Sequence, residues 1–267
     1  MLAPSPAHRN EPKLPVKIVC YSRAVLKLAA RTGWLAGASY VRLRDLRGIE
    51  SVGFIDIDWR NYDFEKHLQA VRKHRPLFTV AKDLIRATDL SRTLDQAYEL
   101  LKWSKFVILV PKAPRLGPKL SSIIPEDFIL GYSVPTKYGG TGIPLQCFRG
   151  RKVHLLGGRP DVQRKIACSL DVVSLDGNRF TLDAKFGDYF DGEIFRPHPV
   201  GGYHRCLRDS IRNIEALWDG YRYEGRIRHL VQDQEGEGRR PPVGEEAGGG
   251  RLLRARLRSA LRARPSD

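Results

Sequence analysis

The sequence is poor in cysteine and has no long apolar run. Its four cysteines, Cys20, Cys147, Cys168 and Cys206, lie far apart with no paired spacing, which argues against a Cys-x-x-Cys zinc site and a disulfide-dense scaffold. The longest aliphatic run, Phe106 to Val110, is far short of the roughly 20 apolar residues that cross a bilayer, and the first 15 residues carry no long apolar stretch. We therefore expect a protein of the reducing cytoplasm with no membrane span, no secretory route and no structural zinc.

Negative charge is also scarce. Lys and Arg number 46 against 30 Asp and Glu, which gives a net charge of +16. A positive excess of this size concentrates polyanions near the protein surface, so a nucleic-acid partner is expected. The alternative is that GC-rich coding inflates the arginine content without a functional consequence.

Length and composition otherwise describe a globular protein of one large or two small domains, with 267 residues, 42% of them hydrophobic. Residues 1–15 are rich in proline and predict a loose leader, and residues 16–232 predict the folded domain. Residues 233–267 predict a disordered Gly/Arg-rich tail, because they cannot bury enough apolar area to offset their ordering entropy. Within that tail, a helix over 251–262 that grips phosphates or an acidic membrane is the alternative to a poorly ordered basic end.

Short β-branched runs alternate with amphipathic stretches from Val16 to Trp218. The helical stretches show apolar residues at helical spacing over 64–71, 94–101 and 207–218. Alternation of this kind is typical of a parallel sheet covered by helices. The predicted strands are Val16–Cys20, Val52–Ile57, Leu77–Ala81, Phe106–Val110, Phe128–Val134, Val153–Leu156 and Asp171–Leu175.

Seven strands favour an α/β, TIM-like (β/α)₈ barrel, somewhat irregular, with one strand too weak to recognise. A doubly wound sheet is the alternative. The barrel is preferred because no Gly-x-Gly-x-x-Gly turn follows the first strand.

Aspartates follow three of the predicted strands, and the C-terminal strand ends of a barrel are where catalytic groups gather. Asp56 and Asp58 end the second strand, Asp83 follows the third, and Asp176 ends the seventh, with Asn178 two residues later. Carboxylates in different surroundings can divide the work, one as nucleophile at a sugar carbon and one as proton shuttle. The alternative is that each aspartate caps the following helix or turn, and residues 176–178 also form an ordinary turn sequence.

Two glycine-bearing segments follow strands. After His154 the chain reaches Gly157-Gly158 and then a predicted helix, so bare amides at a positive helix N-terminus can approach a base or phosphate. Residues 131–140 offer amides, the Ser133 hydroxyl and an aromatic surface, including Tyr132, for stacking a base. The alternatives are two tight turns and a histidine that is a satisfied core residue.

These residues together resemble a known family. His154-Leu155-Leu156-Gly157-Gly158, a following helix and the strand at 171–176 are similar to the late-barrel region of the tRNA-guanine transglycosylase superfamily. Combined with the segments 54–56 and 132–136, they resemble most its short phage and prokaryotic relatives, which are associated with placing 7-deazaguanines in DNA. The resemblance covers roughly Val52 to Trp218.

The resemblance implies a mechanism without a cofactor. Asp176 would be the nucleophile that attacks the deoxyribose C1′, displaces guanine and holds a covalent sugar–enzyme intermediate. Asp56 would be the acid/base for the leaving and entering bases, and a free 7-deazaguanine such as preQ0 would enter. Two displacements of this kind retain configuration, as in retaining glycosidases. The expected substrate-binding residues are Asp83, Asp58, Ser133, His154, Gly157, Gly158 and Asn178.

The sequence departs from the larger tRNA enzymes in several ways. It lacks their cluster of three zinc-binding cysteines and a histidine, and their added RNA-binding module, which favours DNA over tRNA as the substrate. Their Asp-Ser-Gly-Gly-Phe-Gln segment is replaced by residues 56–59, which leaves open whether Asp56 or Asp58 is the acid/base. A base in duplex DNA must be flipped out, so a partner protein that opens the strands is a possible companion.

Three hypotheses follow for the function. The first is a pentosyltransferase that exchanges guanine in DNA for a 7-deazaguanine. The second is a non-catalytic nucleic-acid-binding module on the same barrel, in which the aspartates only cap. The third is a barrel enzyme for a small phosphorylated metabolite, which would use the Gly157-Gly158 turn for phosphate and explains the net charge less well.

Overall fold

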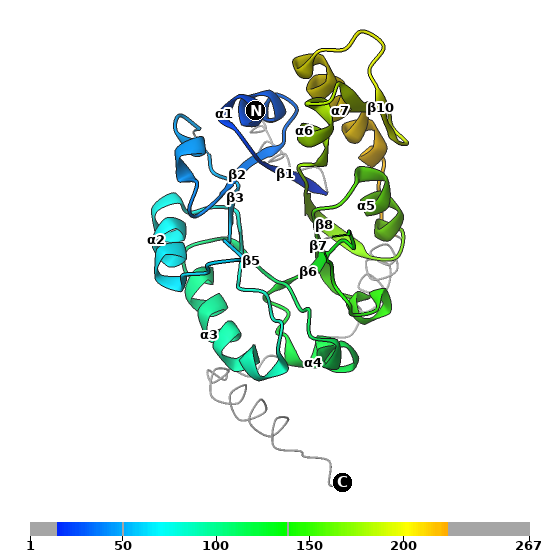
Figure 1. Ribbon diagram of the computed structural model, residues 1–267. Helices are drawn as coiled ribbons and strands as arrows, with labels where there is room; N and C mark the ends of the chain where they lie inside the picture. Colours follow the sequence, from blue (N-terminus) through cyan, green and yellow to red (C-terminus); the bar gives the residue numbers. More distant parts are fainter. Residues whose placement is uncertain (1–14, 50, 138, 224–267) are drawn as a thin grey trace, which may run out of the picture. The chain divides into compact units, whose positions relative to one another are not determined.

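A computed structural model describes residues 15–49, 51–137 and 139–223. Within this part of the chain, strands β1 to β8 pair in parallel in sequence order, and β8 pairs back onto β1, which closes a barrel (Figure 1). The strands are β1 Val16–Cys20, β2 Leu35–Ser39, β3 Phe54–Asp56, β4 Phe78–Val80, β5 Phe106–Leu109, β6 Ile129–Ser133, β7 Lys152–Leu156 and β8 Asp171–Asp176.

Helices cover the outside of the barrel (Figure 1). The α-helices are α1 Arg23–Ala30, α2 Phe64–His74, α3 Leu90–Leu101, α4 Leu120–Ile123, α5 Pro160–Ala167, α6 Arg179–Ala184 and α7 Tyr203–Trp218. Short 3₁₀ turns lie at η1 Leu43–Leu46, η2 Ala87–Asp89, η3 Pro114–Lys119 and η4 Leu145–Phe148, and an antiparallel pair, β9 Asp188–Phe190 and β10 Phe195–Pro197, lies between α6 and α7. None of the described helices combines the length and apolar character needed to cross a membrane.

The predicted (β/α)₈ barrel is confirmed, and the doubly wound alternative is wrong because the sheet closes. All seven predicted strands are present, with ends shifted by one or two residues. Except for residue 15, the predicted leader lies outside the described residues. The predicted tail at 233–267 also lies outside them.

The unrecognised strand is β2, whose sequence Leu-Ala-Gly-Ala-Ser has low strand propensity. Its small residues are required by packing. A Cβ on Gly37 would lie 2.7 Å from the Cys20 sulfur and 3.0 Å from the Phe54 Cβ. Tertiary packing therefore selects against the bulky residues by which a strand is recognised in a sequence.

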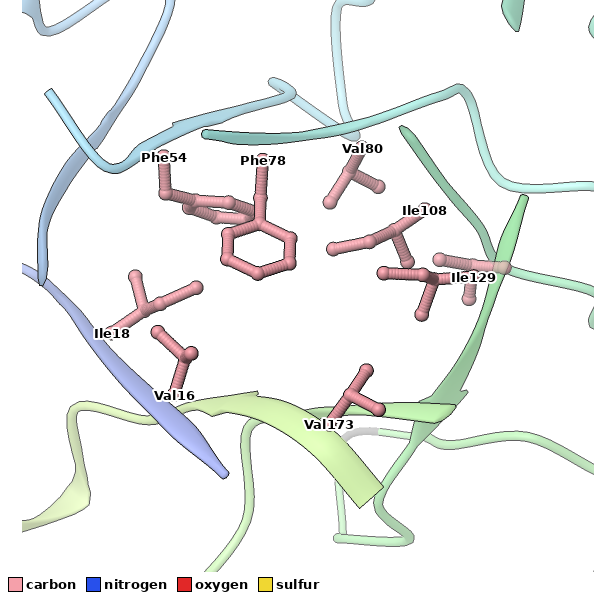
Figure 2. Close-up of a cluster of buried hydrophobic side chains, with 9 residues drawn as sticks. Val16, Ile18, Phe54, Phe78, Val80, Ile108, Ile129 and Val173 are labelled. Atoms are coloured by element: carbon pink, nitrogen blue, oxygen red, sulfur yellow. The ribbon is translucent and has the colours of Figure 1, made fainter. Parts of the chain in front are cut away.

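Apolar side chains from six strands fill the barrel interior (Figure 2). They are Val16, Ile18, Phe54, Phe78, Val80, Ile108, Ile129 and Val173, with Val110 directly after β5. Such a packed interior means that chemistry can occur only above it, at the ends of the strands.

An irregularity in β8 decides which residues face the interior. The register between β7 and β8 slips at His154, which pairs with Ser174 and leaves Val173 as an extra residue. Beyond this bulge Asp176 pairs with Ile18 of β1, a core residue that points into the barrel. In a regular strand, residues that share a face are an even number of positions apart, whereas Val173 and Asp176 are three apart. The bulge between them allows both side chains to face the interior.

Replacing Ile108 by alanine is expected to lower the free energy of unfolding by about 2–5 kcal/mol, because Ile108 is fully buried in the barrel core. Ile85 is 64% exposed, so Ile85→Ala is the matched control and should change that free energy by no more than about 0.5 kcal/mol. Urea unfolding followed by circular dichroism measures both. Equal effects of the two substitutions would contradict the assignment of the core.

Candidate active site

Polar residues form the layer directly above the apolar core. Asp56 lies two residues after the core residue Phe54, and Cys20 two residues after Ile18, so both face inward. Ser39 pairs in register with Asp56 and shares its face. The inward polar residues at the strand ends are Cys20, Ser39, Asp56, Ser133 and Asp176. The change from apolar to polar at one level marks the mouth of the barrel as the candidate site.

Asp56 is a partly buried carboxyl group at the end of β3. Burial, followed by the negative charge of Asp176, raises its pKa to about 7, and the charge of Asp83 adds to the increase. The backbone N–H of Ile57, which donates to Asp56 Oδ1 at 2.8 Å, opposes the shift. Near neutral pH Asp56 therefore exists in both protonated and ionised forms, as a group that gives and takes a proton requires.

Asp176 is held as a hydrogen-bond acceptor by the neighbouring strand. The backbone N–H of Gly157 donates to Asp176 Oδ1 at 3.0 Å, and His154 Nε2 lies 3.4 Å from the same oxygen. His154 is fully buried, its Nδ1 lies 2.8 Å from Ser174 Oγ, and its ring stacks against Phe54 at 5.9 Å between centroids. The Gly157 hydrogen bond orients the Asp176 carboxylate, which remains 16% exposed, whereas His154 Nε2 makes no hydrogen bond to the described residues.

The Gly157-Gly158 turn performs this positioning through its backbone. Both glycines have positive φ, 62° and 88°, and a Cβ on Gly158 would lie 2.5 Å from the Val134 side chain. The Gln163 side chain donates to the carbonyl oxygens of Gly157 at 2.8 Å and Asp176 at 2.7 Å. The turn and Gln163 together connect the ends of β7 and β8.

Asp83 differs from the other two aspartates because it has a cationic partner. Lys112 Nζ lies 2.7 Å from Asp83 Oδ2, so one carboxylate of the group is neutralised within the site. A cavity of about 110 Å³ opens beside Asp83 and is also lined by Lys82, Arg86 and Arg92. Asp89 also lines this cavity and pairs with Arg86 at 3.0 Å, so Lys82 and Arg92 are the cations suited to an anionic group such as a phosphate.

The capping alternative does not describe Asp56 or Asp176. Helix α2 is capped by Asp63, whose side chain accepts from the N–H of Lys66 at 3.1 Å, and not by either of the aspartates that end β3. The N-cap position of α6 is Asn178, without a side-chain cap bond, and not Asp176. Neither aspartate therefore caps a helix, although Asp56 Oδ1 accepts from the N–H of the next residue, Ile57, at 2.8 Å.

Asp58, Ser133 and Asn178 are the remaining predicted site residues. Asp58 Oδ1 accepts from the N–H of Arg60 at 3.1 Å in a turn of its own, and Ser133 lies at the mouth on β6. Asn178 is occupied in holding the barrel closed, because its amide donates to the Cys20 carbonyl at 2.7 Å and its Oδ1 accepts from the Cys20 N–H at 3.3 Å. The structure shows this structural contact, and the predicted substrate contact of Asn178 stays a prediction.

Tyr132 does not supply the aromatic surface expected of residues 131–140. Its ring is buried and packs edge-on against Phe148, with 5.2 Å between centroids. The other aromatic residue of that segment, Tyr138, lies outside the described residues. An exposed aromatic residue follows the end of β3: Trp59 is 71% exposed and has the Arg60 guanidinium 4.8 Å from its ring.

Sequence reasoning missed several residues of the mouth. Lys112 and Gln163 are recognisable only from their partners, because a lysine after a strand and a glutamine in a helix are common. Ser39 and Cys20 belong to strand ends, and Ser39 was missed with the strand β2 that carries it. Among residues 15–49, 51–137 and 139–223, no three side chains of His, Cys, Asp or Glu form a group that could hold a metal ion.

A protein-family model matches most of the chain. A family model described as a family of unknown function (DUF6610) matches residues 29–219, from the last turn of α1 to the end of α7. The chain belongs to the DUF6610 family. A search of curated proteins finds no match to it. The range that matches DUF6610 contains Asp56, Asp83 and Asp176, whereas Cys20 precedes it.

The raised pKa of Asp56 predicts a stability cost in this DUF6610 chain. Between about pH 4 and about pH 7 the folded protein keeps a proton on Asp56 that the unfolded chain has released, so stability falls as pH rises through this window. The change from 3.8 to about 7 corresponds to a ceiling of about 4 kcal/mol. Asp56→Asn removes the ionisable group, and we expect it to raise the free energy of unfolding by about 1–4 kcal/mol at about pH 8 and much less at about pH 4.

Denaturant unfolding at the two pH values measures this difference. Asp58→Asn, two residues away, is the control and should show no such pH dependence. A loss of stability for Asp56→Asn at the higher pH would contradict the electrostatic description of the mouth.

Proposed function

We propose that the protein is a pentosyltransferase that exchanges guanine in DNA for a free 7-deazaguanine through a covalent aspartyl–sugar intermediate. The observation that carries the proposal is the pairing of two unlike carboxyl groups at one barrel mouth. Asp56 has a pKa of about 7, raised by burial and by the charge of Asp176, whereas Asp176 accepts a hydrogen bond from the Gly157 amide. Two carboxyl groups in different environments are the groups that a retaining transfer at a sugar carbon needs.

In the first step Asp176 acts as the nucleophile. Its carboxylate oxygen forms a bond to the deoxyribose C1′ while the C1′–N9 bond to guanine breaks, and the proton on Asp56 passes to the departing guanine. The Gly157 N–H donates to the Asp176 carboxylate and orients it before the sugar arrives. The products of this step are guanine, ionised Asp56 and the covalent sugar ester.

In the second step the incoming base reverses the sequence. Ionised Asp56 takes the N9 proton of the 7-deazaguanine, N9 forms a bond to C1′, and the bond to Asp176 breaks. A group with a pKa of about 7 is suited to both proton transfers at neutral pH. Asp83 is the candidate for reading the base, because it lies close enough for its charge to raise the pKa of Asp56.

A nucleic acid is favoured as the polymer by the net charge of +16, and the resemblance to the short DNA-directed relatives points to DNA. A flipped nucleotide has to reach the mouth of the barrel, and Lys82 and Arg92 beside Asp83 are suited to hold its phosphate. A non-catalytic nucleic-acid-binding module on the same barrel is the second candidate. The high net charge favours it equally, whereas the raised pKa of Asp56 favours only the enzyme.

Nucleoside mass spectrometry tests the proposal. DNA from cells that make the protein together with a 7-deazaguanine should contain the modified deoxynucleoside, and DNA from cells that make the Asp176→Asn variant should not. The two proteins must be present at equal soluble levels. Unmodified DNA in both cultures, with DNA binding retained in vitro, would reject the enzyme and leave the binding module.

A further inference from the structure

A positively charged surface lies outside the barrel, along helix α1. Two adjoining hollows, of about 590 Å³ and about 390 Å³, flank this helix and share Ala24 and Lys27 in their lining. We define the α1 groove as these two hollows. Its cations are Arg23, Lys27, Arg31, Arg44, Arg47 and Arg208.

The cations of the α1 groove are exposed and largely unneutralised. Arg23, Lys27, Arg31, Arg44 and Arg47 form no ion pair with a carboxylate among residues 15–49, 51–137 and 139–223. Arg208 lies 3.4 Å from Asp209, and Asp45 is the one acidic residue in the lining of either hollow. A cluster of cations without counterions is costly through mutual repulsion, and a polyanion would remove this cost.

The spacing of the cations fits a chain of phosphates. Arg23, Lys27 and Arg31 recur every four residues on one side of α1, so they span about 12 Å of helix. Each phosphate of one DNA strand rises about 3.4 Å along the duplex axis, so a stripe that runs parallel to this axis spans the rise of about three to four phosphates. Leu28, Leu207 and Tyr203 supply an apolar floor to the second hollow.

The α1 groove also begins beside the candidate active site. Arg23 follows Cys20, which ends β1 at the mouth and whose thiol pKa is raised by burial and by the charges of Asp56 and Asp176. Arg44 and Arg47 follow β2 at the same end of the barrel. Figure 1 shows α1 next to α6 and α7 on the outside of the barrel. A strand lying in the groove therefore leads directly to the mouth.

We infer that the α1 groove binds the phosphate backbone of the DNA whose base is presented to the barrel mouth. This inference rests on the proposed function for the identity of the polymer. It adds a binding surface that is separate from Asp56, Asp83 and Asp176. Contacts of this kind are sequence-independent and depend strongly on salt, because each neutralised phosphate releases counterions.

Fluorescence anisotropy of labelled duplex DNA, measured with the full-length protein over a salt series, tests the inference. The groove variant carries Arg23→Gln, Lys27→Gln, Arg44→Gln and Arg47→Gln. Removal of four phosphate contacts should lower the salt slope by about three to four and weaken binding by about 10²- to 10³-fold near 0.1 M salt. The matched control removes four exposed cations from other surfaces, through Lys73→Gln, Lys119→Gln, Arg149→Gln and Lys152→Gln.

Equal losses of affinity in the groove and control variants would overturn the inference, because net charge alone would then explain binding. Loss of binding to phosphatidylserine vesicles with unchanged DNA binding would overturn it as well and assign the groove to a membrane. The single variant Lys27→Glu gives a second measurement if the fourfold variant does not fold. If the wild-type protein binds DNA through the groove but never exchanges a base, the proposed function is rejected and the inference about the groove stands.

Discussion

Replacing Asp176 by asparagine is expected to abolish base exchange, with a fall in rate on the order of 10⁴-fold or more, while DNA affinity stays within about twofold. An amide cannot form the ester to the sugar, and this removes the first step altogether. Asparagine has the shape of aspartate, so its Oδ1 can still accept from the Gly157 N–H that holds Asp176. Exchange is measured as release of labelled guanine from duplex DNA in the presence of 7-deazaguanine.

Asp95→Asn is a suitable control, because Asp95 is exposed on the surface of α3, away from the residues assigned to the site. Its exchange rate should match that of the unmodified protein. Full activity of Asp176→Asn would show that another group attacks the sugar. Loss of DNA affinity in that variant would show instead that Asp176 contributes to binding.

Replacing Asp56 by asparagine is expected to lower the exchange rate by about 10²- to 10⁴-fold and to remove its pH dependence. In the unmodified protein, guanine release requires the protonated form of Asp56, so its single-turnover rate should fall about tenfold per pH unit above about pH 7. The second displacement requires the ionised form and should slow below that pH. The variant has neither limit, because its amide does not titrate in this range.

The pH profile also distinguishes Asp56 from Asp58. If Asp58 were the acid/base, Asp58→Asn would flatten the profile and Asp56→Asn would preserve it. We expect the reverse, because the electrostatic contacts with Asp176 and Asp83 are those of Asp56, whereas Asp58 accepts from the Arg60 amide in a local turn.

Much of the barrel could be predicted from the sequence, because buried parallel strands are short β-branched runs. The runs at Phe106–Val110 and Asp171–Leu175 each correspond to a strand. The strand Leu35–Ser39 could not be predicted in this way, since its Gly37 is selected by the close approach of Cys20 and Phe54. The β9–β10 pair was also missed, because strands of three residues carry too little periodicity.

The candidate site was predictable in part. Strand-end aspartates are identified as soon as the strands are, which explains why Asp56, Asp83 and Asp176 were found. The residues that neutralise Asp83 and support Asp176 are distant from them in the sequence. Lys112 reaches Asp83 from the next strand, and Gln163 reaches Asp176 from α5, and nothing in the spacing of the residues predicts either contact.

Tyr132 and Asn178 show what residue type leaves open. Each follows the polar or aromatic pattern of a ligand contact, yet Tyr132 packs into the core and Asn178 bonds to the backbone of Cys20. Residue type alone does not separate a ligand contact from a structural one, because both use the same donors, acceptors and rings. The direction of the side chain decides, and this direction depends on the closed barrel.

Trapping of the covalent intermediate tests the central claim most directly. The protein is incubated with labelled duplex DNA without a 7-deazaguanine, denatured and digested, and the peptides are analysed by mass spectrometry. We predict a sugar adduct on the peptide that contains Asp176, present in the unmodified protein and absent from Asp176→Asn. Transfer of 7-deazaguanine into DNA with no adduct at any time, or with an adduct on a different residue, would contradict the account.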